Sequence, residues 1–463
     1  MTYYAVRKTD TPAIKNAPLE GLYEGNGTFN NIHLAVLLFV VPWFVKRLIP
    51  LVNLGGFKTY WFMFLLCGLP VTLGYWTVMS MYGKRKNEKI QLPGRNIEEY
   101  MTIHDPELRA KYNKQEKVPM QIFHDAYFEG KIDFNGDVLD ILEQRHDWSK
   151  MVFTPELFKY VLFNLIPDVI RHTEEQDTEQ VRDHYDRGDD FYEWFLGPRM
   201  IYTSGIVTDL TRMETLEELQ DNKLTVVCEK LNLQPEDHLL DIGCGWGTLA
   251  AFAHKNYGCK VTGVTLAQKQ AAFGNERIVK NGGDPSRAKI VCTDYRYTPG
   301  GRGAYNKIVS LEMAEHVGIR RYQSFLRQVY DLLDDDGVFV FQVAGLRPAW
   351  QYEDLIWGLF MNKYIFPGAD ASCSLGWVIS ATIHRWYLNW VSNKDKVVEA
   401  YGDRWYRIWV FFLAWSVIIA RNGGSSVFQL TLHKNLNAYP RILGVTNHAS
   451  ILVKPEKEIL PVD

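Results

Sequence analysis

The stretch Leu239-Leu-Asp-Ile-Gly-Cys-Gly-Trp-Gly247 decides the fold. Apolar residues around one acid, Asp241, indicate the end of a buried strand, and three alternating glycines lead into a helix that begins near Thr248. Glycines at alternate positions let the backbone approach a bulky ligand and pack closely on the sheet. Asp241 can accept hydrogen bonds from a cationic amine or a ribose hydroxyl. The stretch therefore predicts a nucleotide-like cofactor at the carboxyl end of a strand in a parallel sheet.

Strands and helices alternate on both sides of this loop, which predicts a parallel, doubly wound α/β sheet. We expect this domain to run from residue 179 to 463. A later apolar run, Ile408–Ala420, lies between two arginines and is too short to cross a membrane, so we expect a buried helix there. The expected strands are His238–Asp241, Lys260–Thr265, Lys289–Cys292, Lys307–Leu311 and Gly337–Val343, and the expected helices are Leu216–Leu231, Thr248–Tyr257, Ala267–Asn281 and Tyr322–Leu333.

Composition narrows the class of protein. A chain of 463 residues has room for two or three structural units. The net charge of −3 argues against nucleic acid as a partner. The six cysteines are scattered without a Cys-x-x-Cys pair, which indicates reduced cytosolic thiols rather than a disulfide framework or a metal site. An aromatic content of 14% suits a membrane interface or an apolar pocket.

Two apolar segments precede the α/β domain. Ile32–Val45 carries no charge, and Thr59–Tyr82 is long enough to cross a hydrocarbon core about 30 Å thick. The basic run Gly83–Lys89 follows directly, and basic residues beside a span mark its cytosolic side. We therefore expect a cytosolic tail over residues 1–31, a hairpin of two transmembrane helices over 32–82, and a helical connector over 83–178. A pair of buried core helices is the alternative to the hairpin.

The glycine loop departs from a nicotinamide dinucleotide site in two ways. Such a site needs Gly-x-Gly-x-x-Gly and an acid after the second strand. Here the third glycine comes one residue early, and the second strand ends at Thr265 without a carboxylate. Thr265 and Gln270 instead offer a hydroxyl–amide pair for a ribose, although strand-end and helix-cap chemistry would explain them equally well. With Asp241 before the loop and Asp294-Tyr295 placed near an adenine, these residues favour S-adenosylmethionine.

Further motifs occur in a fixed order around the loop. They are His184–Gly188, Pro198–Ser204, Gly263–Gln270, Asp294–Arg296, Ile308–Gly318 and Asn362–Pro367. With the loop, they resemble the cyclopropane fatty-acid synthase and mycolic-acid methyltransferase family over roughly Glu179 to Leu436. The resemblance implies a class I S-adenosylmethionine-dependent methyltransferase fold, which is a Rossmann-like doubly wound sheet.

The resemblance also implies roles for individual residues. Glu315 is the expected catalytic residue, because in the related synthases this carboxylate helps to hold a bicarbonate ion that serves as base. For His316 beside it, a capping or core role is the stronger expectation. The expected cofactor-binding residues are Tyr202, Thr203, Leu239, Leu240, Asp241, Ile242, Gly243, Cys244, Gly245, Trp246, Gly247, Thr265, Leu266, Ala267, Gln268, Lys269, Gln270, Asp294 and Tyr295.

The chain departs from the family pattern at two places. The related synthases carry a cysteine where this chain has Ser204 and a histidine where it has Gln342, and both contact the bicarbonate. Bicarbonate is therefore an open expectation as a second cofactor. The segment Gly368–His384 is also shorter than its counterpart in the family, which holds a helix and a strand there. We expect either a missing sheet strand or a locally shortened fold.

With the apolar hairpin in front, the chain most resembles the fungal branch of this family, whose members methylate C9 of sphingolipid long-chain bases. This implies methyl transfer to C9 of the C8–C9 double bond of a ceramide or glucosylceramide held in the bilayer. The expected location is an endomembrane, by default the endoplasmic reticulum, with the catalytic domain in the cytosol. The alternatives are a cyclopropane synthase acting on phospholipid acyl chains and an inactive, shortened membrane scaffold.

Overall fold

The computed structural model describes residues 30–82, 93–167, 188–209, 212–317, 321–346, 352–366, 378–421 and 425–435. The chain divides into two compact units. Of the described residues, those of 30–167 and 352–361 form the N-terminal unit, and those of 188–346 and 362–435 form the other. The sequence predicted one domain over residues 179–463, whereas residues 352–361 cluster with the N-terminal unit.

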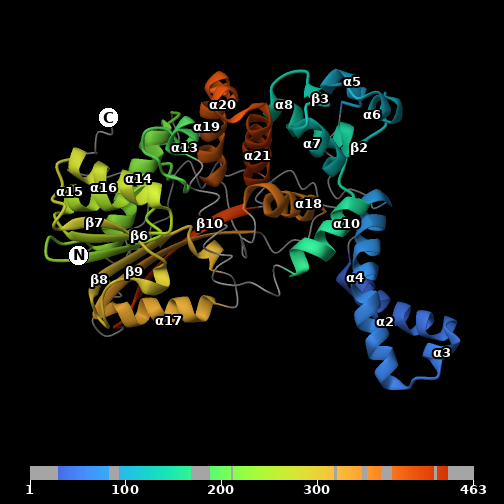
Figure 1. Ribbon diagram of the computed structural model, residues 1–463, viewed down its shortest axis with the longest axis horizontal. Coiled ribbons are helices and arrows are strands. Elements are labelled where there is room, and N and C mark those ends of the chain that lie inside the picture. Colours follow the sequence, from blue (N-terminus) through green and yellow to red (C-terminus); the bar gives the residue numbers. More distant parts are fainter. Residues whose placement is uncertain are drawn as a thin grey trace, which may run out of the picture. The chain divides into compact units, whose positions relative to one another are not determined.

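The unit that contains the glycine loop is built on a six-stranded sheet in the order β10-β9-β8-β5-β6-β7 (Figure 1). The five strands expected from the sequence pair in parallel, as predicted. The sixth strand, β10, pairs antiparallel with β9 and was not anticipated, because its partner lies some eighty residues earlier in the chain. The strands are β5 (His238–Ile242), β6 (Lys260–Thr265), β7 (Ala288–Cys292), β8 (Tyr305–Leu311), β9 (Leu333–Leu346) and β10 (Ser425–His433).

Helices cover both faces of this sheet. Successive strand residues point to opposite faces, so Leu239 packs in the core under α14–α16 while Leu240 packs in the core under α17. Figure 1 shows the first group of helices on one face and α17 on the other. This arrangement confirms the doubly wound fold. The helices are α14 (Leu216–Leu231), α15 (Thr248–Tyr257), α16 (Gln268–Lys280) and α17 (Tyr322–Leu332).

A second group of helices belongs to the same unit: α13 (Asp189–Leu196), α19 (Val378–Ser392), α20 (Lys394–Tyr401) and α21 (Asp403–Arg421). In α21 every residue from Ile408 to Ala420 is buried, which confirms a core helix in place of a third span. Because α19 already begins at Val378, only residues 367–377 remain for the shortened segment, and they lie outside the described residues.

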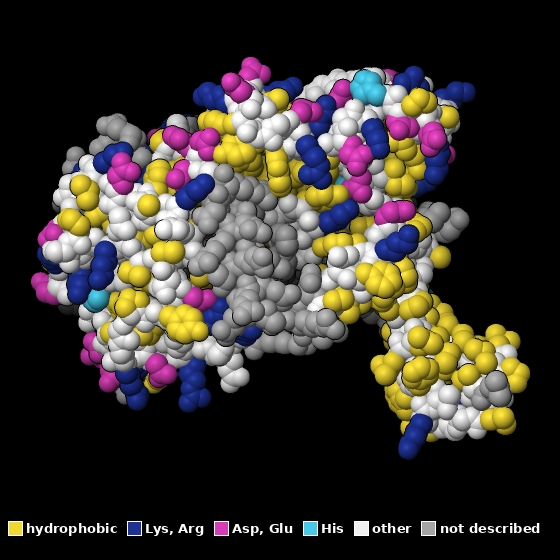
Figure 2. All heavy atoms as spheres, viewed as in Figure 1, with side chains coloured by type: hydrophobic (Ala, Val, Ile, Leu, Met, Phe, Trp, Pro, Cys, Tyr) yellow, Lys and Arg dark blue, Asp and Glu magenta, His cyan; other side chains and the backbone are white. Residues whose placement is uncertain are grey.

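The N-terminal unit begins with a helical hairpin. Helices α2 (Asn31–Leu48) and α4 (Phe57–Tyr82), with α3 (Pro50–Asn53) between them, run alongside each other (Figure 1). The hydroxyl of Tyr60 donates to the carbonyl of Phe39 at 3.0 Å. Apolar side chains cover the outside of the hairpin (Figure 2), with Leu65 76% and Leu54 85% exposed. Among the described residues, α2 and α4 are the two helices long and apolar enough to cross a membrane.

Residues 93–167 form more than the helical connector that the sequence suggested. Short strands pair here as β1–β3 and β2–β4, around an aromatic core in which Phe123 packs on Trp148 at a centroid distance of 4.6 Å. The elements are α5 (Ile97–Tyr100), β1 (Met101–Ile103), α6 (Pro106–Lys111), β2 (Val118–Pro119), α7 (Met120–Phe128), β3 (Ile132–Phe134), α8 (Val138–Glu143), α9 (Arg145–Trp148), β4 (Ser149–Lys150), α10 (Pro155–Tyr160) and, from later in the chain, α18 (Tyr352–Phe360).

Candidate active site

A pocket opens at the carboxyl ends of β5, β6 and β8, where a parallel sheet is expected to bind its ligand. The lining comes from the loop that precedes α14, the glycine loop after β5, and the residues at the ends of β6, β7 and β8. The lining residues are Met200–Thr203, Lys223, Leu224, Asp241, Gly243–Trp246, Thr248, Leu249, Val264–Leu266, Gln270, Thr293–Arg296, Leu311–Met313 and His316.

The glycine loop adopts a backbone that few other residues could adopt. Gly243, Gly245 and Gly247 all have positive φ angles, of 78°, 52° and 73°. A Cβ atom on Gly245 would meet no protein atom within 4 Å, so this position opens onto the pocket. A Cβ atom on Gly247 would lie 2.8 Å from the Cα atom of Gly274 in α16. The loop therefore packs closely on α16 at Gly247 and leaves open space at Gly245.

Asp241 lies at the end of β5 with its carboxylate buried beside the pocket. Its Oδ2 atom has no hydrogen-bond donor among the residues that the structure describes. Burial raises the pKa of Asp241 to about 7, and the nearby charge of Lys223 works against that rise. A buried acceptor without a donor is costly, so this atom suits a donor that arrives with a ligand.

Lys223 is a pocket residue that sequence reasoning missed. It projects from α14, and its Nζ atom donates to the Oγ1 atom of Thr203 at 2.5 Å. Burial lowers the pKa of Lys223 to about 8, while the charges of Glu312 and Asp241 oppose that fall. The available signal was its place on the buried face of an amphipathic helix, where a lysine is rare.

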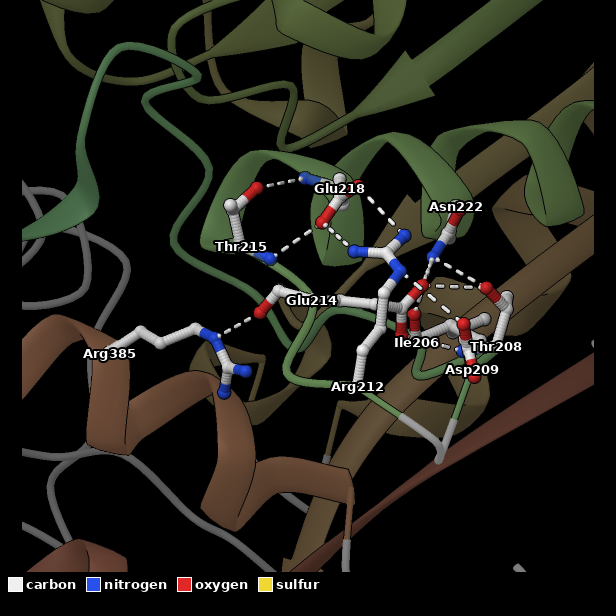
Figure 3. Close-up of polar contacts among 9 residues, drawn as sticks. All are labelled: Ile206, Thr208, Asp209, Arg212, Glu214, Thr215, Glu218, Asn222 and Arg385. Atoms are coloured by element: carbon white, nitrogen blue, oxygen red, sulfur yellow. Dashed lines mark hydrogen bonds and ion pairs between the residues drawn. The ribbon is translucent and has the colours of Figure 1, made fainter. Parts of the chain in front are cut away.

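A polar cluster surrounds the start of α14, a few residues after Tyr202 and Thr203 in the chain (Figure 3). The buried carboxylate of Glu214 accepts from the backbone N and the Oγ1 atom of Thr208, at 2.8 and 2.6 Å, and from Asn222 at 2.9 Å. Thr215 and Glu218 form a capping box at the start of α14. Arg385 of α19 donates to the carbonyl of Glu214 at 2.8 Å. These bonds fix the start of α14, the helix that carries the pocket residues Lys223 and Leu224.

The expected ribose and adenine residues also line the pocket. Thr265 donates to the Oε1 atom of Gln270 at 2.6 Å, so the hydroxyl–amide pair is assembled before any ligand binds. Asp294 accepts from the Nε atom of Arg296 at 2.8 Å, which adds a guanidinium that the sequence did not suggest. Tyr202, Thr203, Asp241, Gly243, Cys244, Gly245, Trp246, Thr265, Leu266, Gln270, Asp294 and Tyr295 lie in the lining.

Other expected residues lie behind the lining. Leu239, Leu240 and Ile242 are buried in the sheet core, where their apolar side chains belong. Gly247 packs on α16. Ala267 caps α16, and the next two residues, Gln268 and Lys269, are exposed.

Two acids follow β8, and they differ in position. Glu315, the expected catalytic residue, is buried behind the lining. Its Oε1 atom accepts from the backbone N of Ala344, and in the described part of the chain its Oε2 atom has no partner. Burial, and then the charge of Glu312, raise the pKa of Glu315 to about 8. Glu312 lines the pocket itself, as does His316, whose pKa burial lowers to about 4.

Comparison with known proteins places the chain in a family. Residues 172–430 match the model of the family described as mycolic acid cyclopropane synthetase. Sphingolipid C9-methyltransferase 2 of Gibberella zeae is 55% identical over 95% of this chain and 88% of its own length. Sphingolipid C9-methyltransferase of Komagataella phaffii is 54% identical over 94% of both chains.

Solved structures agree with this placement. The cyclopropane synthase MmaA2 from Mycobacterium tuberculosis aligns with a TM-score of 0.52 at 26% identity, over 56% of this chain and 98% of that one. The mycolic acid cyclopropane synthase CmaA1, complexed with S-adenosylhomocysteine (SAH), aligns with a TM-score of 0.51 at 26% identity, over the same shares of the two chains. The chain therefore belongs to the mycolic acid cyclopropane synthetase family, and it is an S-adenosylmethionine-dependent methyltransferase.

Proposed function

We propose that this enzyme transfers a methyl group to C9 of the C8–C9 double bond of a sphingolipid long-chain base. One observation carries the proposal. The relatives named sphingolipid C9-methyltransferase match 94–95% of the chain, whereas the family model matches only residues 172–430. The sequence similarity to these relatives therefore includes the apolar hairpin and residues 93–167, which follow it.

The pocket residues fit the cofactor. S-adenosylmethionine supplies an electrophilic methyl group on a sulfonium centre. The unpartnered Oδ2 atom of Asp241 accepts a hydrogen bond from the cationic amine, and Thr265 with Gln270 binds the ribose. Asp294 and Tyr295 lie at the adenine end, and Tyr202 covers the pocket from the loop before α14.

Of the two acids after β8, Glu312 lines the pocket and faces the charge that develops in the reaction. Attack by an alkene leaves a carbocation. A carboxylate stabilises this cation far better in a pocket that excludes water than in bulk water, which screens the charges. Glu315 contributes from behind the lining. Because its raised pKa keeps it protonated at neutral pH, we expect Glu315→Gln to leave cofactor affinity unchanged and to lower turnover less than tenfold.

The hairpin is proposed to cross an endomembrane, with the endoplasmic reticulum as the default, and to keep the catalytic unit in the cytosol. The exposed apolar surfaces of α2 and α4 support this. The substrate is then a membrane lipid that enters the pocket from the bilayer, and no nucleic acid is involved.

The experiment that tests the function uses the full chain in liposomes that contain a glucosylceramide with a C8 double bond. We expect a product with a methyl branch and a retained alkene by NMR. A cyclopropane ring on phospholipid acyl chains would establish the rival synthase instead. Normal SAH binding without any lipid product would indicate the inactive scaffold.

Cofactor affinity is expected to depend on pH. Asp241 has a pKa of about 7 before ligand binds, and only its ionised form accepts the amine's hydrogen bond at full strength. Protons therefore compete with the ligand below pH 7. We expect SAH affinity to fall by up to tenfold per pH unit between pH 7 and 5.5, measured by calorimetry. Asp241→Asn should bind weakly with no such slope, and an equal slope in this variant would assign the titration to another group.

A further inference from the structure

The carboxylate of Glu312 occupies the position that the resemblance assigns to bicarbonate. The Oε1 atom of Glu312 accepts from the backbone N and the Oγ atom of Ser204, at 3.1 and 3.0 Å, and from the Nε2 atom of Gln342 at 2.6 Å. Ser204 and Gln342 stand where the related synthases place two bicarbonate contacts. Their donors already hold a carboxylate of the chain, so these residues do not fit a bicarbonate ion.

The backbone at Glu312 directs this side chain. Its φ angle is +53°, which is uncommon for a residue other than glycine and often marks a functional position. The backbone N of Glu312 donates to the carbonyl of Gln342 at 2.8 Å, which fixes the peptide directly after β8. One carboxylate oxygen is anchored, and the structure shows no donor to the other, Oε2, among its described residues. Since Glu312 lines the pocket, it can present Oε2 to a substrate.

A chain of hydrogen bonds fixes the orientation of Gln342. Its Oε1 atom accepts from Gln429 at 2.9 Å, and the Oε1 atom of Gln429 accepts from the Nζ atom of Lys230 at 2.5 Å. With its oxygen held by Gln429, the amide of Gln342 must turn its NH₂ group toward Glu312. Gln429 lies on β10, so the antiparallel strand contributes a positioning residue to the site.

The two acids differ in the donors and charges that surround them. Burial raises the pKa of Glu312, but the donors from Ser204 and Gln342 and the charge of Lys223 favour its ionised form. Glu315 has no comparable set of donors, and its pKa rises to about 8. A pair of carboxyl groups in different environments is the usual arrangement for acid–base chemistry. Glu312 is the acid whose oxygen is held by donors that favour its ionised form.

We propose that Glu312 is the base that removes the proton from the methylated substrate, in place of bicarbonate; this rests on the proposed function. The π electrons of the alkene form the new bond between C9 and the methyl carbon, and the methyl–sulfur bond breaks with its electron pair left on sulfur. The cation then lies at C8. The C9–H bond breaks, its electron pair restores the double bond, and the proton passes to the Oε2 atom of Glu312.

The test compares Glu312→Gln and Glu312→Gly with the wild-type chain in liposomes. Glycine suits the positive φ angle, so Glu312→Gly removes the carboxylate without straining the fold. We expect kcat to fall by about 10²–10⁴-fold in both variants, while SAH affinity by calorimetry stays within twofold. Added bicarbonate or formate should restore part of the turnover of Glu312→Gly, and chloride at the same ionic strength should not. Wild-type turnover should be the same with and without bicarbonate.

Three results would overturn the proposal. They are a Glu312→Gln variant with more than a tenth of wild-type kcat, stimulation of the wild-type enzyme by bicarbonate, and a loss of SAH affinity as large as the loss of turnover. The proposed function fails separately, if the wild-type chain binds SAH but methylates no sphingolipid. In that case the same variants are compared on unsaturated phospholipid, where the expected losses and the overturning results stay the same.

Discussion

Asp241→Ala is expected to weaken SAH binding by at least a hundredfold. The variant removes the buried carboxylate of Asp241. Among the described residues, no donor reaches the Oδ2 atom of this carboxylate. A hydrogen bond between charged groups contributes about 1.5–3 kcal/mol, and the ligand's amine would remain buried without its partner. Since 1.4 kcal/mol corresponds to a factor of ten, about 3 kcal/mol gives the expected loss.

Calorimetry on the full chain measures this loss directly. Asp237→Asn is the matched control, because Asp237 precedes the same strand at its other end, away from the pocket, and contacts Lys307 at 3.9 Å. We expect this control to bind SAH normally. If Asp241→Ala bound SAH within threefold of the wild-type chain, the amine would have to be held elsewhere, and the placement of the cofactor would be wrong.

Glu353→Gln is expected to destabilise the N-terminal unit by about 3–5 kcal/mol, because it leaves a buried guanidinium without its counter-charge. The Arg145 side chain is 0% and that of Glu353 5% exposed. Arg145 donates through Nη2 to the Oε2 atom of Glu353 at 3.0 Å and through Nε to the other oxygen. His146 contacts the Oε2 atom at 3.1 Å. Burial alone would raise the pKa of Glu353, but the charge of Arg145 and the hydrogen bonds with Arg145 and His146 hold it well below its ordinary value.

Chemical denaturation of the full chain in detergent, followed by tryptophan fluorescence, tests this expectation. The matched control is Glu99→Gln, which removes an acid that is 55% exposed and 3.8 Å from Arg95. Exposed pairs contribute little, so this control should change stability by less than about 1 kcal/mol. The double variant Arg145→Met, Glu353→Met should recover much of the lost stability, since it leaves no unpaired buried charge. Equal stability of Glu353→Gln and wild type would contradict the buried pair.

The glycine loop, the parallel strands and many of the residues that line the pocket could be predicted from the sequence because each depends on local pattern. Alternating glycines allow the positive φ angles that the loop adopts, and apolar runs with helices between them favour a parallel sheet. Thr265 and Gln270 are five residues apart across a strand end, which brings them together in any sheet of this kind. Exposed apolar residues along α2 and α4 likewise follow from composition alone.

The tertiary structure alone decided which acid faces the pocket. Glu312 and Glu315 both follow β8, and their spacing cannot say which one meets the donors of Ser204 and Gln342. Those donors come from a loop more than a hundred residues earlier and from a strand that follows β8, so only the folded sheet brings them to one oxygen atom. The same holds for Lys223 beside Asp241, for Gln429 on the antiparallel strand β10, and for Arg145 with Glu353. Pairs of this kind depend on contacts between distant segments, and no periodicity in a single sequence records them.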